Sequence, residues 1–259
     1  MPRLAANLSM MFNEVPFLDR FDAAAKAGFT AVEFLFPYEW PAAELKRRLD
    51  ANGLRQVLFN MPPGDWAAGE RGLASLPGRQ AEFRANVGRA LDYAAALDCE
   101  LVHCMAGIPP AGTPPVTAAA LFAANVAWAA EQALAAGVKL ALEPINHRDM
   151  PGYHLNTMQQ GADVIAAIGA DRVGLQFDLY HCQTTEGDIT KRMEKLMPVI
   201  AHMQLADVPD RHEPGTGEIG WDYVLRRIDA LGYQGWIGCE YRPAGDTVAG
   251  LAWRTRFGV

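Results

Sequence analysis

The sequence has no apolar run of the roughly 18 residues that a membrane span needs, and it has few basic residues for a polyanionic partner. Its 23 Lys and Arg residues are outnumbered by 30 Asp and Glu residues, which leaves a net charge of −7. A surface of this sign repels nucleic acid and anionic lipid. We therefore expect neither nucleic acid nor a membrane as partner. The oligomeric state stays open at this point.

Cysteine is also scarce. The four cysteines, at positions 99, 104, 182 and 239, show no CxxC spacing, so we interpret them as reduced thiols. The first residues, Met1–Asn7, lack the apolar core of a signal peptide and lead directly into a strand pattern. Both observations favour a cytoplasmic protein.

Two further absences limit the fold. No linker rich in Ser, Gly and Pro divides the chain, and half of its residues are hydrophobic, so we expect one domain over residues 1–259. A doubly wound open sheet usually carries a GxGxxG turn after an early strand, and none stands there. The missing turn makes a doubly wound open sheet, the main alternative fold, less favoured than a closed α/β barrel.

The chain alternates short buried strands with amphipathic helices. Strands are predicted at residues 3–8, 31–35, 54–59, 100–106, 138–142, 173–178, 200–205 and 235–240. Helices are predicted to begin near Pro16, Pro41, Gln80, Thr117, Thr157, Asp188, Trp221 and Thr247, the last one running to Trp253. Eight units of about 32 residues are typical of a (β/α)₈ TIM barrel.

One segment, residues 61–79, is too long for an ordinary connection between a strand and a helix. Long insertions at the carboxyl ends of barrel strands commonly cover a site. Trp66 would supply an apolar cover and Arg71 a cation, so we favour a lid over a mobile loop without function.

Oxygen-bearing side chains end four consecutive strands: Glu143, Asp178, Gln204 and Glu240. In a barrel these ends meet at one mouth. Three carboxylates and an amide oxygen form a hard ligand set that suits Mg²⁺ or Mn²⁺ rather than Zn²⁺. The alternative is an acid cluster neutralised by an arginine, namely Arg172, Arg211 or Arg242.

This ligand set suits chemistry on a hydroxy-carbonyl compound, in which a divalent cation acidifies the C–H beside a carbonyl. Glu143 and Glu240 are the candidates to remove and return the proton through an enediolate. His181 follows Asp178 by three residues and is a candidate for substrate contact, as is Asn7 near the tip of the first strand. Where such a compound carries a carboxylate, a cation is needed to bind it; Arg71 is the first candidate, with Arg211 and Arg242 as alternatives.

The chain resembles the hydroxypyruvate isomerase family, a branch of the xylose-isomerase-like TIM barrels. The resemblance lies in the segments Ala5–Met11, Val32–Phe34, Gly64–Arg71, Glu143–Asn146, Asp178 with His181, Glu213–Glu218 and Gly238–Tyr241. It implies interconversion of hydroxypyruvate and tartronate semialdehyde, with Glu143 and Glu240 as the acid/base pair. It also implies a metal at Glu143, Asp178, Gln204 and Glu240.

Other segments resemble the related 2-oxo-tetronate isomerases, which act on a four-carbon acid; these segments are Met10–Arg20, Pro209–Pro214 and Gly245–Leu251. A sugar 3-epimerase ranks lower because those enzymes usually have His where Gln204 stands. A dehydratase would share the metal but expel a hydroxyl group. An endonuclease-IV-like phosphodiesterase would need more histidines than six and a basic face. A non-catalytic sugar-binding module gives no reason for three carboxylates to converge.

Overall fold

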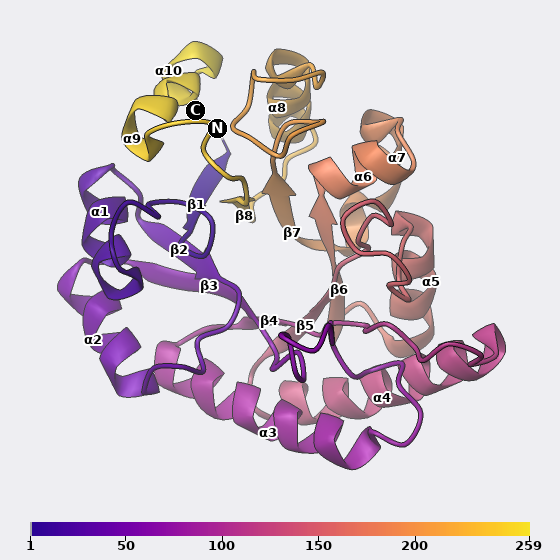
Figure 1. The fold of residues 1–259 in the computed structure, drawn as a ribbon. Coiled ribbons are helices and arrows are strands. Elements are labelled where there is room, and N and C mark those ends of the chain that lie inside the picture. Colours follow the sequence, from indigo (N-terminus) through magenta and orange to yellow (C-terminus); the bar gives the residue numbers. More distant parts are fainter. Residues whose placement is uncertain (1) are drawn as a thin grey trace.

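The computed structural model describes residues 2–259 and forms a closed barrel of eight parallel strands in the order β1 to β8 (Figure 1). The strands are β1 Arg3–Asn7, β2 Ala31–Phe34, β3 Arg55–Asn60, β4 Leu101–His103, β5 Lys139–Leu142, β6 Val173–Asp178, β7 Ile200–Leu205 and β8 Trp236–Cys239. Pairing of β1 with β8 closes the ring. The predicted TIM barrel is therefore confirmed.

Helices surround the barrel on its outside (Figure 1). They are α1 Arg20–Lys26, α2 Ala42–Ala51, α3 Gln80–Leu97, α4 Pro115–Ala135, α5 Met158–Ile168, α6 Leu179–Thr185, α7 Ile189–Leu196, α8 Trp221–Ala230, α9 Thr247–Gly250 and α10 Ala252–Phe257. The start of α5 shows how sequence fixes these boundaries. Thr157 accepts a hydrogen bond from the backbone of Gln160, and the Gln160 side chain accepts one from the Thr157 backbone, so that the two residues form a capping box at the predicted helix start.

Two details of the sequence-based assignment were wrong. Helix α6, which begins directly after Asp178, was not predicted; its seven residues are too few to show a helical period against the apolar strand before them. The predicted last helix, Thr247–Trp253, is divided in two because Gly250, a weak helix former, ends α9 before α10 begins. Within residues 2–259, no helix combines the length and the hydrophobicity needed to cross a bilayer.

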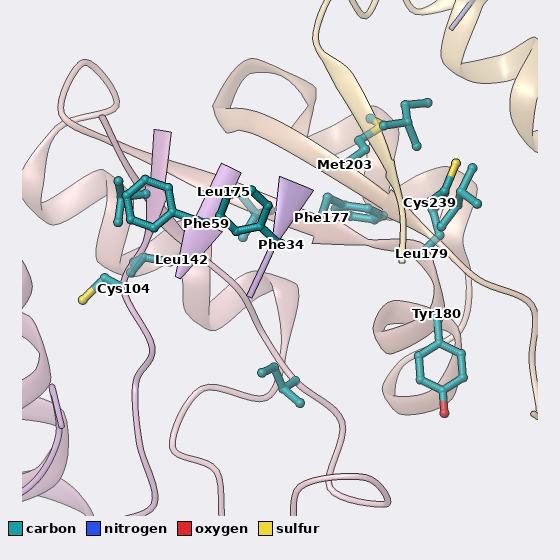
Figure 2. Close-up of a cluster of buried hydrophobic side chains, with 14 of the residues drawn as sticks. Phe34, Phe59, Cys104, Leu142, Leu175, Phe177, Leu179, Tyr180, Met203 and Cys239 are labelled. Carbon is teal, nitrogen blue, oxygen red and sulfur yellow. The ribbon is translucent and has the colours of Figure 1, made fainter. Parts of the chain in front are cut away.

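Successive strand residues point alternately outward and into the barrel. Outward-facing apolar side chains form the main core between strands and helices, among them Phe34, Phe59, Leu142, Phe177 and Met203 (Figure 2). The interior is polar instead. Glu33 on β2 bonds to His202 and Gln204 on β7, and these hydrogen bonds must cross the barrel because β2 and β7 are not neighbours. This hydrogen-bonded polar interior lies directly beneath the strand ends that form the barrel mouth.

The long segment between β3 and α3 contains no helix or strand and is tied to the barrel at its base. Gly72 packs against the Met105 backbone so closely that a Cβ there would lie 2.4 Å from the Met105 carbonyl oxygen. Glu70 forms an ion pair with Arg79, and Ser75 donates to the Ala106 carbonyl. Trp66, in contrast, is 40% exposed. The base of the segment is packed, and its tip projects over the barrel mouth.

Candidate functional site

Three buried carboxylates and one imidazole converge at the carboxyl ends of the strands. Glu143 follows β5, Asp178 ends β6 and Glu240 follows β8, while His181 lies in the first turn of α6. One potential ligand atom from each of these four side chains lies within 4.8 Å of the others. The structure thus brings together three of the four predicted metal ligands and adds a histidine predicted for substrate contact.

Arg211 is the cation within this cluster. Its guanidinium donates to both Glu240 and Asp178. Arg211 lies in the loop after β7, where its backbone is left-handed with φ +59°. Of the three arginines considered as neutralising partners, Arg211 is the one that contacts the acids here. The Nε atom of Arg211 is buried without a partner among the described residues, so its hydrogen-bonding capacity is not filled.

Burial and mutual repulsion make these acids hold their protons. Burial raises the pKa of Glu240 to about 8, although Arg211 opposes the shift. Burial likewise raises the pKa of Asp178 to about 6, with Arg211 again in opposition. Burial and the neighbouring Glu240 and Asp178 raise the pKa of Glu143 well above its ordinary value. Without a further cation, the cluster is therefore partly protonated near neutral pH.

This gives a prediction for the protein treated with EDTA. Between about pH 6.5 and 8, Glu240, whose pKa is raised to about 8, keeps its proton in the folded state and loses it on unfolding. Because the folded state then binds more protons, its stability falls as pH rises through this window. We expect the melting temperature of wild type to fall more steeply than that of Glu240→Gln over this range. Parallel slopes for the two proteins would contradict the raised pKa.

His181 is held as a neutral hydrogen-bond donor toward the cluster. Burial lowers its pKa well below the ordinary value. Its Nδ1 lies 2.7 Å from the Asn146 amide nitrogen, and the Asn146 amide is oriented because its oxygen accepts from the Asp149 backbone. Nδ1 is thus an acceptor, so the proton is on Nε2, which lies 3.5 Å from Asp178 Oδ2 and 3.7 Å from Glu143 Oε1. This arrangement favours donation to a substrate oxygen over metal ligation.

Gln204 and Asn7 lie beneath the acids, inside the barrel. The Gln204 amide nitrogen donates to Glu33 at 2.8 Å, and its oxygen accepts from Gln176 at 2.6 Å. The Asn7 amide nitrogen lies 3.0 Å from Glu33 Oε1 and 3.2 Å from Glu240 Oε1. Asn7 is not part of the cavity wall described next, so its predicted contact with substrate stays a prediction.

A cavity of about 520 Å³ opens above the cluster. Glu143, His181, Glu240 and Arg211 form its floor, and the predicted lid residues Trp66 and Arg71 form part of its wall. The Arg71 guanidinium stacks on the Trp66 ring at 3.8 Å and donates to the Trp66 and Glu70 carbonyls. Among the described residues, no carboxylate forms an ion pair with Arg71. Its charge is thus available to the cavity.

The donor set fits a hard divalent cation. Glu143 Oε1 is buried and has no hydrogen-bond partner among the described residues, although it belongs to the four-residue cluster. A buried oxygen of this kind costs free energy unless a proton or a cation satisfies it. Carboxylate oxygens are the ligands that Mg²⁺ and Mn²⁺ prefer.

Sequence reasoning assigned no role to two groups that the structure places here. Glu33 was noticed only as part of a family segment, and its position among apolar strand residues was the available signal. Asn146 fixes the His181 tautomer, which no sequence pattern indicates because the two residues are 35 positions apart.

Comparison with known proteins places this site in a family. The sequence profile described as xylose isomerase-like TIM barrel matches residues 21–257. The chain belongs to the xylose isomerase-like TIM barrel family. This confirms the resemblance seen in the sequence.

Alignments with individual relatives extend over almost the whole chain. A 2-oxo-tetronate isomerase of Cupriavidus necator is 56% identical over 98% of this chain and 97% of its own length. The hydroxypyruvate isomerase of Escherichia coli K12 is 46% identical over 98% of both chains. A crystal structure from Brucella melitensis, described as an AP endonuclease of family 2, is 49% identical with a TM-score of 0.96 over 99% of both chains. The chain is an isomerase, as its sequence predicts.

Proposed function

We propose that the protein interconverts hydroxypyruvate and tartronate semialdehyde by proton transfer through an enediolate. The observation that carries this proposal is the placement of Glu143 and Glu240, two buried carboxyl groups with raised pKa values, in one metal-suited cluster on the cavity floor. A carboxyl group whose pKa lies near the working pH is suited to take a proton and to return it. A cytoplasmic location, which we also propose, agrees with four buried free thiols.

In the proposed reaction, one of the two glutamates removes the proton from the hydroxyl-bearing carbon of the substrate. The other delivers a proton to the former carbonyl carbon. The hydroxyl proton passes to the former carbonyl oxygen, so that the carbonyl moves by one position with no net gain or loss of protons. His181 donates through Nε2 to a substrate oxygen, where negative charge develops in the enediolate. Arg71, over the cavity, binds the substrate carboxylate, and closure of Trp66 excludes water.

A divalent cation, Mg²⁺ or Mn²⁺, would be held by Glu143, Asp178, Gln204 and Glu240. When bound, it would polarise the substrate carbonyl and acidify the neighbouring C–H. The three carboxylates lie together at the mouth. For Gln204, the remaining lone pair of the amide oxygen supports the assignment, since Gln176 occupies only one.

The metal proposal gives a prediction that is independent of turnover. A ligand present at 100 times its Kd stabilises the folded state by about 2.7 kcal/mol. For a chain of this size we expect Mg²⁺ or Mn²⁺ to raise the melting temperature of EDTA-treated protein by about 5–10 °C. Asp178→Asn, which removes one anionic ligand, should reduce this shift strongly. An unchanged melting temperature of wild type in millimolar Mn²⁺ would contradict the site.

The experiment that tests the function is NMR of the reaction in D₂O, with hydroxypyruvate as substrate and with or without EDTA. We expect tartronate semialdehyde to form, EDTA to stop the reaction, and deuterium exchange to accompany turnover. Failure to convert hydroxypyruvate in the presence of Mg²⁺ and Mn²⁺ would overturn the proposed substrate.

The second candidate is isomerisation of a four-carbon 2-oxo acid. The 56% identical relative named 2-oxo-tetronate isomerase favours it. The same two glutamates would serve both substrates, so a comparison of kcat/KM for hydroxypyruvate and 2-oxo-tetronate decides between them. The NMR product also separates an isomerase from a dehydratase, which would expel water. A phosphodiesterase is disfavoured by the single imidazole in the cluster.

A further inference from the structure

Glu33 is a carboxylate enclosed in the barrel interior, where the proposed reaction does not use it. It is 1% exposed and comes from β2, whereas the proposed ligands lie on or directly after strands β5 to β8. The pairing of β2 with β3 shifts register between Val32 and Glu33. Such irregularities commonly redirect a side chain near a functional site.

Three nitrogen atoms surround this carboxylate. The Gln204 amide nitrogen lies 2.8 Å from Oε1, the Asn7 amide nitrogen lies 3.0 Å from Oε1, and His202 Nε2 lies 2.7 Å from Oε2. Carboxylate oxygens accept hydrogen bonds, and the two amide nitrogens only donate them. Glu33 therefore fixes which way both amides face.

The orientation of the Gln204 amide matters for the proposed metal. With its nitrogen bound to Glu33, its oxygen is on the other side, where it accepts from Gln176. If the amide were reversed, its oxygen would face the Glu33 carboxylate and its NH₂ group would take the place of the oxygen. An NH₂ group has no lone pair to offer a hard cation. Glu33 thus keeps Gln204 an oxygen donor.

Asn7 connects Glu33 to a second proposed ligand, Glu240. Its amide nitrogen bridges Glu33 and Glu240, and its amide oxygen accepts from the Ser9 backbone, which fixes the same orientation from the other end. One Glu240 oxygen is therefore held by a donor that Glu33 orients. Glu33 contacts the Gln204 and Asn7 amides, and through them it reaches two of the four proposed ligand groups.

Strand β8, which is separated from β2 only by β1, leaves room for this carboxylate. A Cβ built at Gly238 on β8 would lie 2.2 Å from Glu33 Oε2 and 2.3 Å from Oε1. A side chain at position 238 would displace the Glu33 carboxylate from its three nitrogen partners. The position of the Glu33 carboxylate therefore depends on the absence of a side chain at Gly238.

We propose that Glu33, in the space left by Gly238, is a positioning residue that orients the amides of Gln204 and Asn7 for cation binding and for proton transfer by Glu240. This proposal rests on the proposed metal-assisted function. Groups that orient metal ligands typically contribute 10- to 100-fold to metal affinity or activity. Substitution of Glu33 should change mainly metal affinity and kcat rather than KM, because the Glu33 side chain does not line the substrate cavity.

The test compares Mn²⁺ affinity, measured by electron paramagnetic resonance, with steady-state kinetics for wild type, Glu33→Gln, Gly238→Ala and Gly174→Ala. Gly238→Ala displaces Glu33 without changing any charge. Gly174→Ala is the matched control, since its Cβ would lie 2.3 Å from the Ala201 side chain on β7 and away from Glu33. We expect Glu33→Gln and Gly238→Ala each to lower Mn²⁺ affinity and kcat by about 10- to 100-fold, with KM nearly unchanged. Gly174→Ala should change Mn²⁺ affinity less than threefold.

The outcomes separate this proposal from the proposed function. If wild type binds no Mn²⁺, the metal site itself is contradicted. If wild type binds Mn²⁺ and Glu33→Gln binds it equally well, only the role of Glu33 is overturned. Equal losses in Gly174→Ala and Gly238→Ala would reduce the effect to barrel packing and would also overturn it. Should Glu33→Gln fail to fold, Gly238→Ala and Glu33→Asp, which keeps the charge and shortens the side chain, decide the matter by the same measurements.

Discussion

Glu143→Gln and Glu240→Gln should each lower kcat by at least about 100-fold, while the far-UV circular dichroism spectrum stays that of wild type. Glutamine keeps the length of the side chain and one oxygen for a cation, but it cannot accept and return a proton. Both residues lie at the cavity floor and both have raised pKa values, which is why we assign them the two proton transfers. Steady-state kinetics with hydroxypyruvate in saturating Mg²⁺ measure the effect.

A glutamate outside the site provides the control. Glu131→Gln changes an exposed residue of α4 and should leave kcat within twofold of wild type. Solvent exchange separates the two steps further, because a variant that lacks only the returning acid still releases the substrate proton to D₂O. A near-wild-type kcat in either variant would make that residue a ligand alone.

Arg71→Met should raise KM for the oxo acid by about 10- to 100-fold, since a hydrogen-bonded charge pair contributes about 1.5–3 kcal/mol. Arg71 stacks on Trp66 at the cavity wall, and Glu70, its neighbour, is already paired with Arg79. Its charge is thus available to a substrate carboxylate. Methionine keeps much of the apolar length that covers Trp66, so the loss is mainly that of charge.

The matched control is Arg84→Met, because Arg84 also stacks on a tryptophan, Trp128, but outside the cavity. We expect its KM to equal that of wild type. Mn²⁺ affinity should be unchanged in both variants, since neither arginine belongs to the ligand cluster. An unaltered KM in Arg71→Met would move the carboxylate contact to Arg211 or Arg242, which also line the cavity.

The sequence was sufficient for the architecture and for the ends of the strands. A strand residue is identified by local pattern, and in a parallel barrel every strand end lies at the same mouth. Asp178, at the end of β6, and Glu143 and Glu240, directly after β5 and β8, were therefore predicted to converge, and the structure places them together. The helix start at Thr157 could also be predicted from local sequence, because its capping box joins residues only three positions apart.

The contacts inside the barrel were decided by tertiary structure alone. Glu33 meets Gln204 across 171 positions of sequence, and Arg211 meets Asp178 and Glu240 only because its loop folds back over the mouth. The His181 tautomer likewise depends on Asn146 in another loop. Local patterns show which face of a strand is apolar. A hydrogen bond across the interior depends instead on strand pairing, on the register shift between β2 and β3 at Glu33, and on the space at Gly238. These are properties of the closed barrel, and no single segment carries them.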